Sequence, residues 1–119
     1  MQRLWVGLGA LAGLGAVAMA AFSAHGLGWL DPSELRMVDR SVQMQGWHAM
    51  ALLTCGLWAP RGGRLTDAAG LAFGSGLILF SGAVYVRALG GISLGPLAPI
   101  GGSLLMLGWL LLAASTLRK

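Results

Sequence analysis

The two histidines are the residues of this chain best suited to proton or metal chemistry. His25 lies in the stretch AFSAHGL and His48 in QGWHAMALL, so each imidazole lies where an apolar run meets more polar sequence. Two imidazoles rarely complete a metal or haem site. The single Cys55 follows His48 by seven residues, which is about 10 Å of helix rise. The pattern therefore favours neither a bound metal nor a cofactor, and Cys55 is expected to be an inert core thiol.

Other kinds of catalysis are not indicated either. No serine or cysteine has a histidine and an acid in a recognisable nucleophile pattern. The four acids lie outside the apolar runs, so no run carries the central carboxylate that a small multidrug-type exporter uses to exchange protons. These acids are Asp31, Glu34, Asp39 and Asp67. We expect a protein that is not an enzyme.

The composition predicts an integral membrane protein. Hydrophobic residues make up 56% of the 119 residues and charged residues only 10%, against roughly 25% charged in soluble domains. The net charge of +4 does not indicate nucleic acid, because the basic residues lie singly or in pairs at the ends of apolar runs. The expected partner is the lipid bilayer.

Four apolar runs predict an all-α, four-helix transmembrane bundle that forms a single domain over residues 1–119. Each is close to the ~20 residues that cross ~30 Å of hydrocarbon. The second run is the weakest, because it contains Gln45 and His48 and is closed by Pro60, which cannot continue a helix built on amide donors. The predicted spans are about 4–24, 42–59, 68–88 and 97–117.

The start of the chain also resembles a secretory signal peptide. A basic residue, Arg3, precedes the apolar run, and Ala18 to Ala20 (AMA) imitates a small-residue cleavage site. The apolar run continues past that site to Ala24. We therefore expect this segment to be kept as the first span.

Between the first and second runs, the segment DPSELRMVDRSV carries the signals of a helix start. Asp31 is the expected N-cap, Pro32 stands at the first helical position and Glu34 follows three residues after the cap. Apolar residues then recur at helical spacing. These are Leu35, Val38 and Val42. The pattern predicts an amphipathic helix that lies at the membrane interface before it turns into the second span.

The basic residues predict the orientation in the membrane. With four spans, one side collects Arg3, Arg61, Arg64, Arg118 and Lys119. The other side has Arg36, Arg40 and Arg87. Five against three favours an inner (plasma) membrane protein with both termini in the cytoplasm. Trp5 and Trp58 are then expected at the inner interface and Trp29 at the outer one.

Small residues recur at four-residue spacing along the spans. Gly9 and Gly13 form such a pair in the first run, and Gly70 and Gly74 form one in the third. Small residues let helix backbones approach closely in lipid. The first run continues the pattern with Ala12, Ala16, Ala20 and Ala24. The rows favour packing within the chain, and a homo-oligomer interface remains the alternative.

Four stretches carry a resemblance to a known family. AFSAHGL, QGWHAMALL, FSGAVY and APIGGSLLMLGW follow one another at sensible spacing over nearly the whole chain. Together they resemble the YgdD-like family of small inner-membrane proteins, domain of unknown function 423. The resemblance implies a four-helix integral membrane protein, and it implies no activity, substrate or catalytic residue.

In the predicted topology these signatures meet at the outer end of the bundle. We expect a polar cluster there in which His25 is hydrogen-bonded to His48, to Tyr85 or to a carbonyl near Pro99, because unpaired polar groups are costly in hydrocarbon. The candidate residues are His25, His48, Ser81, Tyr85, Arg87 and Pro99.

Two functions fit such a protein. The first is a structural, accessory or assembly component of a membrane complex, since the chain is small and lacks a catalytic set. The alternative is a small-solute, ion, proton or lipid-binding module that uses the outer cluster around His25 and His48.

Overall fold

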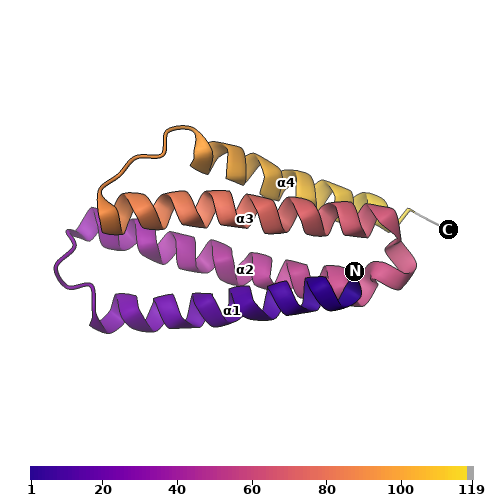
Figure 1. Cartoon of the computed structure of the whole chain (residues 1–119), viewed down its shortest axis with the longest axis horizontal. Coiled ribbons are helices and arrows are strands. Elements are labelled where there is room, and N and C mark those ends of the chain that lie inside the picture. Colours follow the sequence, from indigo (N-terminus) through magenta and orange to yellow (C-terminus); the bar gives the residue numbers. More distant parts are fainter. Residues whose placement is uncertain (118–119) are drawn as a thin grey trace.

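The computed structural model describes residues 1–117 and consists of four long helices (Figure 1). The helices are α1 (Gln2–His25), α2 (Pro32–Gly62), α3 (Arg64–Gly90) and α4 (Leu97–Ser115). The described residues contain no strand, so the predicted all-α, four-helix architecture is confirmed. Arg118 and Lys119, which were counted in the predicted orientation, lie outside the described residues.

The helices pack mainly as sequence neighbours, so the bundle is open rather than closed. α1 packs on α2, α2 on α3, and α3 on α4, while α2 also touches α4. The molecule measures 52 × 27 × 17 Å along its principal axes, which describes a flattened slab. α1 and α4 are thus edge helices, each with one main partner.

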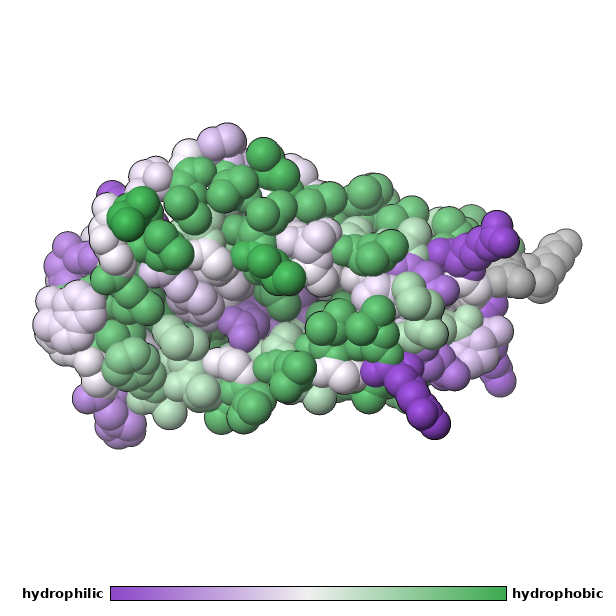
Figure 2. Space-filling model, in the orientation of Figure 1, coloured by the Kyte–Doolittle hydropathy of each residue, from purple (hydrophilic) through white to green (hydrophobic). Residues whose placement is uncertain are grey.

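The surface divides into an apolar middle and hydrophilic ends, as Figure 2 shows. Three helices are long and apolar enough to cross a bilayer, namely α1, α3 and α4. α2 is longer than any of them, at 31 residues. It is less apolar, however, and is not among the three helices that qualify by length and hydropathy. The chain is therefore a helical membrane protein with several helices able to cross the membrane.

The predicted start of α2 is confirmed in detail. Asp31 accepts a hydrogen bond from the Glu34 backbone N–H at 2.8 Å, and Pro32 opens the helix. The amphipathic segment does not turn before the second span, however. It is the first part of one continuous helix from Pro32 to Gly62. Buried Val38 packs with Leu27 and Ala88, which holds this part of α2 along the bundle.

Pro60 does not end α2, in contrast to the prediction. The helix continues through Pro60 to Gly62 and stops at Gly63, whose φ is +63°. A proline inside a helix leaves the carbonyl four residues earlier without its usual donor. That carbonyl belongs to Gly56, and the Gln2 side-chain Nε2 donates to it at 2.8 Å. The first turn of α1 thus supplies the hydrogen bond that Pro60 removes.

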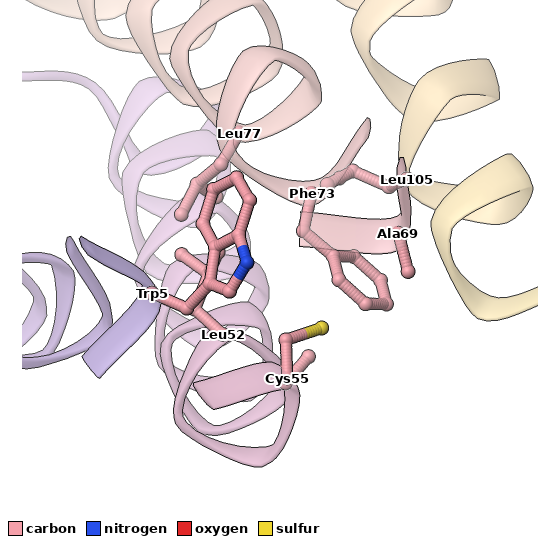
Figure 3. Packing of buried hydrophobic residues seen from close by; sticks show 8 residues of the cluster. Trp5, Leu52, Cys55, Ala69, Phe73, Leu77 and Leu105 are labelled. Atoms are coloured by element: carbon pink, nitrogen blue, oxygen red, sulfur yellow. The ribbon is translucent and has the colours of Figure 1, made fainter. Parts of the chain in front are cut away.

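The main core lies where α1, α2 and α3 meet. Figure 3 shows Trp5 of α1 reaching between Leu52 of α2 and Leu77 of α3. Trp5 is 1% exposed and its indole N–H donates to Asp67 Oδ1 at 2.8 Å. Trp5 is thus a core residue that does not face lipid, while its predicted level near the inner interface stays a prediction. Cys55 is fully buried in the same cluster.

The two other tryptophans predicted at the membrane interfaces differ from each other in how far they are buried. Trp29 is exposed in the turn between α1 and α2, as an interfacial residue would be. Trp58 is half-buried, and its indole N–H donates to Ser115 Oγ at 3.0 Å. It therefore links α2 to α4 rather than standing free at an interface.

Glycines bring the helices together at a few points. A Cβ added to Gly9 would lie 2.8 Å from the Ala49 carbonyl oxygen, so this predicted small residue packs within the chain. Gly76 and Gly101 bring α3 and α4 close together, and the small-residue rows did not include them. Gly74 packs on nothing, because a Cβ there would meet no atom within 4 Å.

Candidate functional site

His25 does not join the predicted polar cluster. It is the last residue of α1 and is exposed. Among residues 1–117 its side chain makes no hydrogen bond, and the nearby Ser23 hydroxyl instead donates to Asp39 Oδ1 at 3.0 Å. The prediction placed His25 correctly at a helix end but assigned it the wrong partners, because sequence spacing does not show toward which side the last turn faces.

His48 lies in the interior of the bundle and is 3% exposed. Its Nδ1 donates to the Met44 carbonyl at 2.6 Å, and its Nε2 accepts from the Trp109 indole N–H of α4 at 3.0 Å. One donating and one accepting nitrogen is the pattern of a neutral imidazole. The ring also packs on Phe73, with centroids 5.7 Å apart. Both ring nitrogens of His48 are therefore engaged.

Gln45, one turn before His48 on α2, connects two further helices. Its Nε2 donates to the Ala12 carbonyl of α1 at 2.9 Å. Its Oε1 accepts from the Tyr85 hydroxyl of α3 at 2.8 Å. Tyr85 is thus part of a polar cluster, as predicted, but its partner is Gln45 and not a histidine.

Together, Gln45 and His48 join α2 to all three other helices. Residues three apart on a helix lie on neighbouring sides of the same turn. One turn of α2 therefore sends an amide toward α1 and α3 and an imidazole toward α4. The same polar residues make the second span the least apolar of the four, and they face the protein interior.

Two buried hydroxyls beside this turn have no hydrogen-bond partner among the described residues. They belong to Ser41 and Ser81, which are 0% and 5% exposed. Ser41 lies close to the Tyr85 hydroxyl without forming a hydrogen bond of good geometry. Ser81 lines a cavity of about 420 Å³ together with Gln45 and Tyr85. Buried polar groups are normally paired, so these two sites call for an explanation.

That cavity continues as a groove between α1 and α3. A second, apolar cavity of about 300 Å³ shares Leu8, Ala12, Leu77 and Ile78 with the first. The two cavities therefore form one groove, with walls on α1 and α3 and a floor on α2. Gln45, Ser81 and Tyr85 line one end of it, although the Ser81 hydroxyl oxygen itself is buried.

The remaining predicted residues lie elsewhere. Arg87 is exposed and lines a separate hollow of about 160 Å³ with Ser93, near the loop between α3 and α4. The Pro99 carbonyl accepts a hydrogen bond from the Ser103 hydroxyl at 2.9 Å within α4. The structure thus places His48, Ser81 and Tyr85 in the interior, and it places His25, Arg87 and Pro99 away from them.

Sequence reasoning did not assign three residues that matter here, namely Ser41, Gln45 and Trp109. A signal existed for Gln45, since a glutamine within an apolar run must find partners. Ser41 and Trp109 gave none, because their roles depend on which helix faces which. Within residues 1–117 no three His, Cys, Asp or Glu side chains are grouped so that they could hold a metal ion.

Comparison with known proteins identifies the family. A family model described as a protein of unknown function (DUF423) matches residues 19–102. The chain belongs to the DUF423 family. The matched segment includes Gln45, His48, Ser81 and Tyr85, so the polar site lies within the family domain.

Relatives of this DUF423 protein occur in several bacteria and are described as membrane proteins. UPF0382 membrane protein SAB0533 of Staphylococcus aureus (strain bovine RF122) is 36% identical, with 98% of each chain covered. The UPF0382 membrane protein of Haemophilus influenzae is 32% identical over 100% of this chain and 98% of its own. UPF0382 membrane protein YwdK of Bacillus subtilis is 32% identical over 98% of each chain. No solved structure matches this chain.

Proposed function

We propose that this DUF423 protein is a non-catalytic structural or accessory component of a membrane complex, and that its edge helix α1 contacts a neighbouring protein. The observation that carries the proposal is the open arrangement of the helices. In the most apolar window of α1 and of α4 only 17% of residues are buried within the chain, against 44% in α3.

The free face of α1 has the residues that helix association in lipid requires. Gly7, Ala10, Ala18 and Ala21 are exposed and recur at helical spacing on this edge. A Cβ at Gly7 would meet no atom within 4 Å. In lipid, helices gain no hydrophobic free energy by burying apolar area against each other. Their association depends instead on close backbone contact, which small residues permit. This row differs from the one that contains Gly9, which is used within the chain.

The interior supports a role without catalysis. Both nitrogens of His48 are engaged by hydrogen bonds, and Cys55 is buried in the apolar core. Tyr85 likewise donates to Gln45, and Gln45 donates to the Ala12 backbone carbonyl. These polar groups act as contacts between helices, which suits a protein whose function is to hold a defined shape in the membrane.

The proposed topology has four spans, with both termini at the cytoplasmic side of the plasma membrane. α2 connects the end of α1 to the start of α3 and runs antiparallel beside both (Figure 1). If α1 and α3 cross the bilayer, α2 must cross it as well. Its 31 residues are about 46 Å long, so its charged first turns extend beyond the ~30 Å hydrocarbon layer.

Photocrosslinking in native membranes tests the proposed contact. A photoreactive phenylalanine analogue placed at Ala10 should give an adduct of defined protein mass, either with a second copy or with another protein. The matched control is the same analogue at Leu57, which is 78% exposed on α2 and has no small-residue row around it. The control should react with lipid only. If both positions give lipid adducts alone, and the gently solubilised protein is a monomer, the proposal is wrong.

A further inference from the structure

A polar hollow lies at the end of the bundle that holds the α1–α2 turn and the α3–α4 loop (Figure 1). Its volume is about 160 Å³, and its polar side chains are Arg87 at the end of α3 and Ser93 in the loop. The Ser93 hydroxyl accepts from the Gly95 backbone N–H at 3.4 Å, so its own hydrogen is left to donate. Both polar side chains of the hollow therefore offer hydrogen-bond donors, and one of them is a cation.

The acids near this end of the bundle bond elsewhere. Asp31 and Glu34 bond to each other's backbone in the cap of α2, and Asp39 accepts from a hydroxyl of α1. Among the described residues, no Asp or Glu lines the hollow. A second cation, Arg40, follows Met37 of the hollow by three residues and so lies beside it on the surface of α2. The hollow therefore carries positive charge without a counterion among the residues that line it.

An apolar groove of about 520 Å³ continues from the hollow between α2 and α4. Ala98 lines both the hollow and the groove, so the two are continuous. The groove has Met44 of α2 on one side and Phe80 of α3 at its floor. Along α4 it extends from Ala98 to Met106, which is eight residue steps and roughly 12 Å of helix rise. A charged hollow thus opens into an apolar groove.

The depth of the hollow in the bilayer is that of lipid headgroups. α3 is able to cross the bilayer, and its middle residue is Leu77. Arg87 follows ten residues later, about 15 Å along the helix, which is half of the ~30 Å hydrocarbon thickness. The groove runs from the start of α4 toward the middle of the same layer. The charged part of the site therefore lies at the level of lipid phosphates, and the apolar part lies at the level of acyl chains.

We propose that the hollow and the groove together bind one anionic phospholipid. Its phosphate accepts hydrogen bonds from Arg87 and Ser93, and one acyl chain lies in the groove as far as Met106. A zwitterionic phospholipid would bring a further cation close to Arg87 and Arg40, so it binds more weakly. A soluble phosphate compound has no chain to place in the groove.

Native mass spectrometry of the full-length protein, titrated in detergent with dioleoylphosphatidylglycerol, measures the affinity of this site. Arg87→Gln removes the cation of the hollow and should weaken binding about tenfold, the lower end of the effect of a hydrogen bond to a charged group. Arg36→Gln is the matched control, because Arg36 is also exposed near this end but lines neither the hollow nor the groove. It should change the affinity by about twofold at most. Equal losses in the two variants would mean general charge attraction and would overturn the proposal.

Gly102→Leu tests the groove. A Cβ at Gly102 would lie 3.9 Å from Phe80, an ordinary contact, so α4 should accept the larger side chain. That side chain fills the groove and should abolish measurable binding of the same phospholipid. Gly46→Leu is the control, since a Cβ there meets nothing within 4 Å and Gly46 does not line the groove. Circular dichroism checks that both variants are folded. Unchanged affinity in Gly102→Leu would show that no acyl chain lies in the groove, and the proposal would be wrong.

Two further probes test the nature of the ligand. Dioleoylphosphatidylcholine has the same chains and phosphate with an added cation, and it should bind at least about tenfold more weakly than the phosphatidylglycerol. Glycerol 3-phosphate has the phosphate without the chains, and it should not displace the bound phospholipid even in large excess. Equal binding of the phosphatidylcholine, or displacement by glycerol 3-phosphate, would overturn the assignment of an anionic phospholipid.

Discussion

The two sides of α3 are joined to their neighbours in different ways. Toward α4 the backbones nearly touch, since a Cβ on Gly101 would lie 2.7 Å from the Gly76 carbonyl oxygen. The same interface holds stacked aromatic rings, with Phe73 and Trp109 centroids 5.0 Å apart. Toward α1 the helix makes few direct contacts, the main one being with Trp5, which donates to Asp67 and packs with Leu77, and a groove lies beside this contact. Tyr85 reaches α1 only through Gln45.

The difference between the α4 and α1 sides of α3 shows two ways of joining helices in lipid, where the hydrophobic effect does not drive them together. Close backbone contact between glycines gains dispersion along the crossing. A long polar side chain such as Gln45 bonds to two helices while keeping them separated by about the length of that side chain. Hydrogen bonds of this kind are worth about 0.6 kcal/mol each in membrane proteins. The α1–α3 side has the fewer direct contacts and is therefore the more easily altered of the two.

The largest expected effect is at the α3–α4 crossing. Gly101→Ala should lower the free energy of unfolding by about 1–3 kcal/mol, because the new methyl group would meet backbone atoms of Gly76 and Phe80 that cannot move aside alone. Gly82→Ala is the control on the groove side, where a Cβ meets nothing within 4 Å. It should leave stability unchanged or raise it by up to about 1 kcal/mol. Titration with sodium dodecyl sulfate, followed by circular dichroism, measures both. Equal losses in the two variants would remove the contrast.

A smaller effect is expected for the hydrogen bonds of Gln45. Gln45→Leu should cost about 1–2 kcal/mol, since two bonds are lost and the Tyr85 hydroxyl is left without its acceptor. Tyr85→Phe alone should cost about 0.6 kcal/mol. In a double-mutant cycle the two changes should show a coupling energy of about 0.6 kcal/mol. Strict additivity would mean that the bond between them contributes nothing.

On the α4 side, the hydrogen bond from Trp109 to His48 should contribute less to the free energy of unfolding than the packing of the rings around it. Trp109→Phe keeps an aromatic ring against Phe73 but removes the donor to His48 Nε2, so the expected loss in unfolding free energy is about 0.6 kcal/mol. His25→Gln is the comparison, and it should change stability by less than about 0.5 kcal/mol because His25 is exposed. The same detergent titration applies. A greater loss in His25→Gln than in Trp109→Phe would contradict the assignment of both histidines.

The smallest expected effect is at the start of α2, the helix that packs on both α1 and α3. The Glu34 backbone N–H, and next the Ser33 hydroxyl, hold the pKa of Asp31 below its usual 3.8. A lowered pKa means that the carboxylate stabilises the helix start above about pH 3.8, and that this contribution is lost as the pH falls through the lower value in the folded protein. The protection factor of the Glu34 amide, which corrects for the intrinsic pH dependence of exchange, should therefore fall below that pH.

Asp31→Asn is the control for this pH effect, because it keeps a cap acceptor but cannot change charge. The protection factor at Glu34 should then show no step in the same pH range. A step of equal size in Asp31→Asn would assign the effect to another group.

The helices and their signals could largely be read from the sequence. Apolar runs of sufficient length predicted α1, α3 and α4, and the Asp31, Pro32 and Glu34 pattern predicted where α2 begins. The end of α2 could not be predicted, because the Gly56 carbonyl that Pro60 leaves without a donor is bonded by the Gln2 side chain, 54 residues from Gly56. The burial of Trp5 could not be predicted for a similar reason, since its hydrogen-bond partner Asp67 belongs to another helix.

The candidate site divides along the same line. Unpaired polar groups are costly in hydrocarbon, so the sequence predicted that polar residues in apolar runs would have hydrogen-bond partners. Tyr85 and His48 do have such partners. Which groups became partners depended on the rotation of each helix about its axis and on the order in which the helices pack. Those quantities arise only when the four surfaces meet. The sequence by itself determined four helices with costly polar groups inside them, because hydrophobicity and capping act locally. Only the tertiary structure decided that Gln45 and His48 face three different helices and that His25 faces none, because these contacts join residues from separate helices.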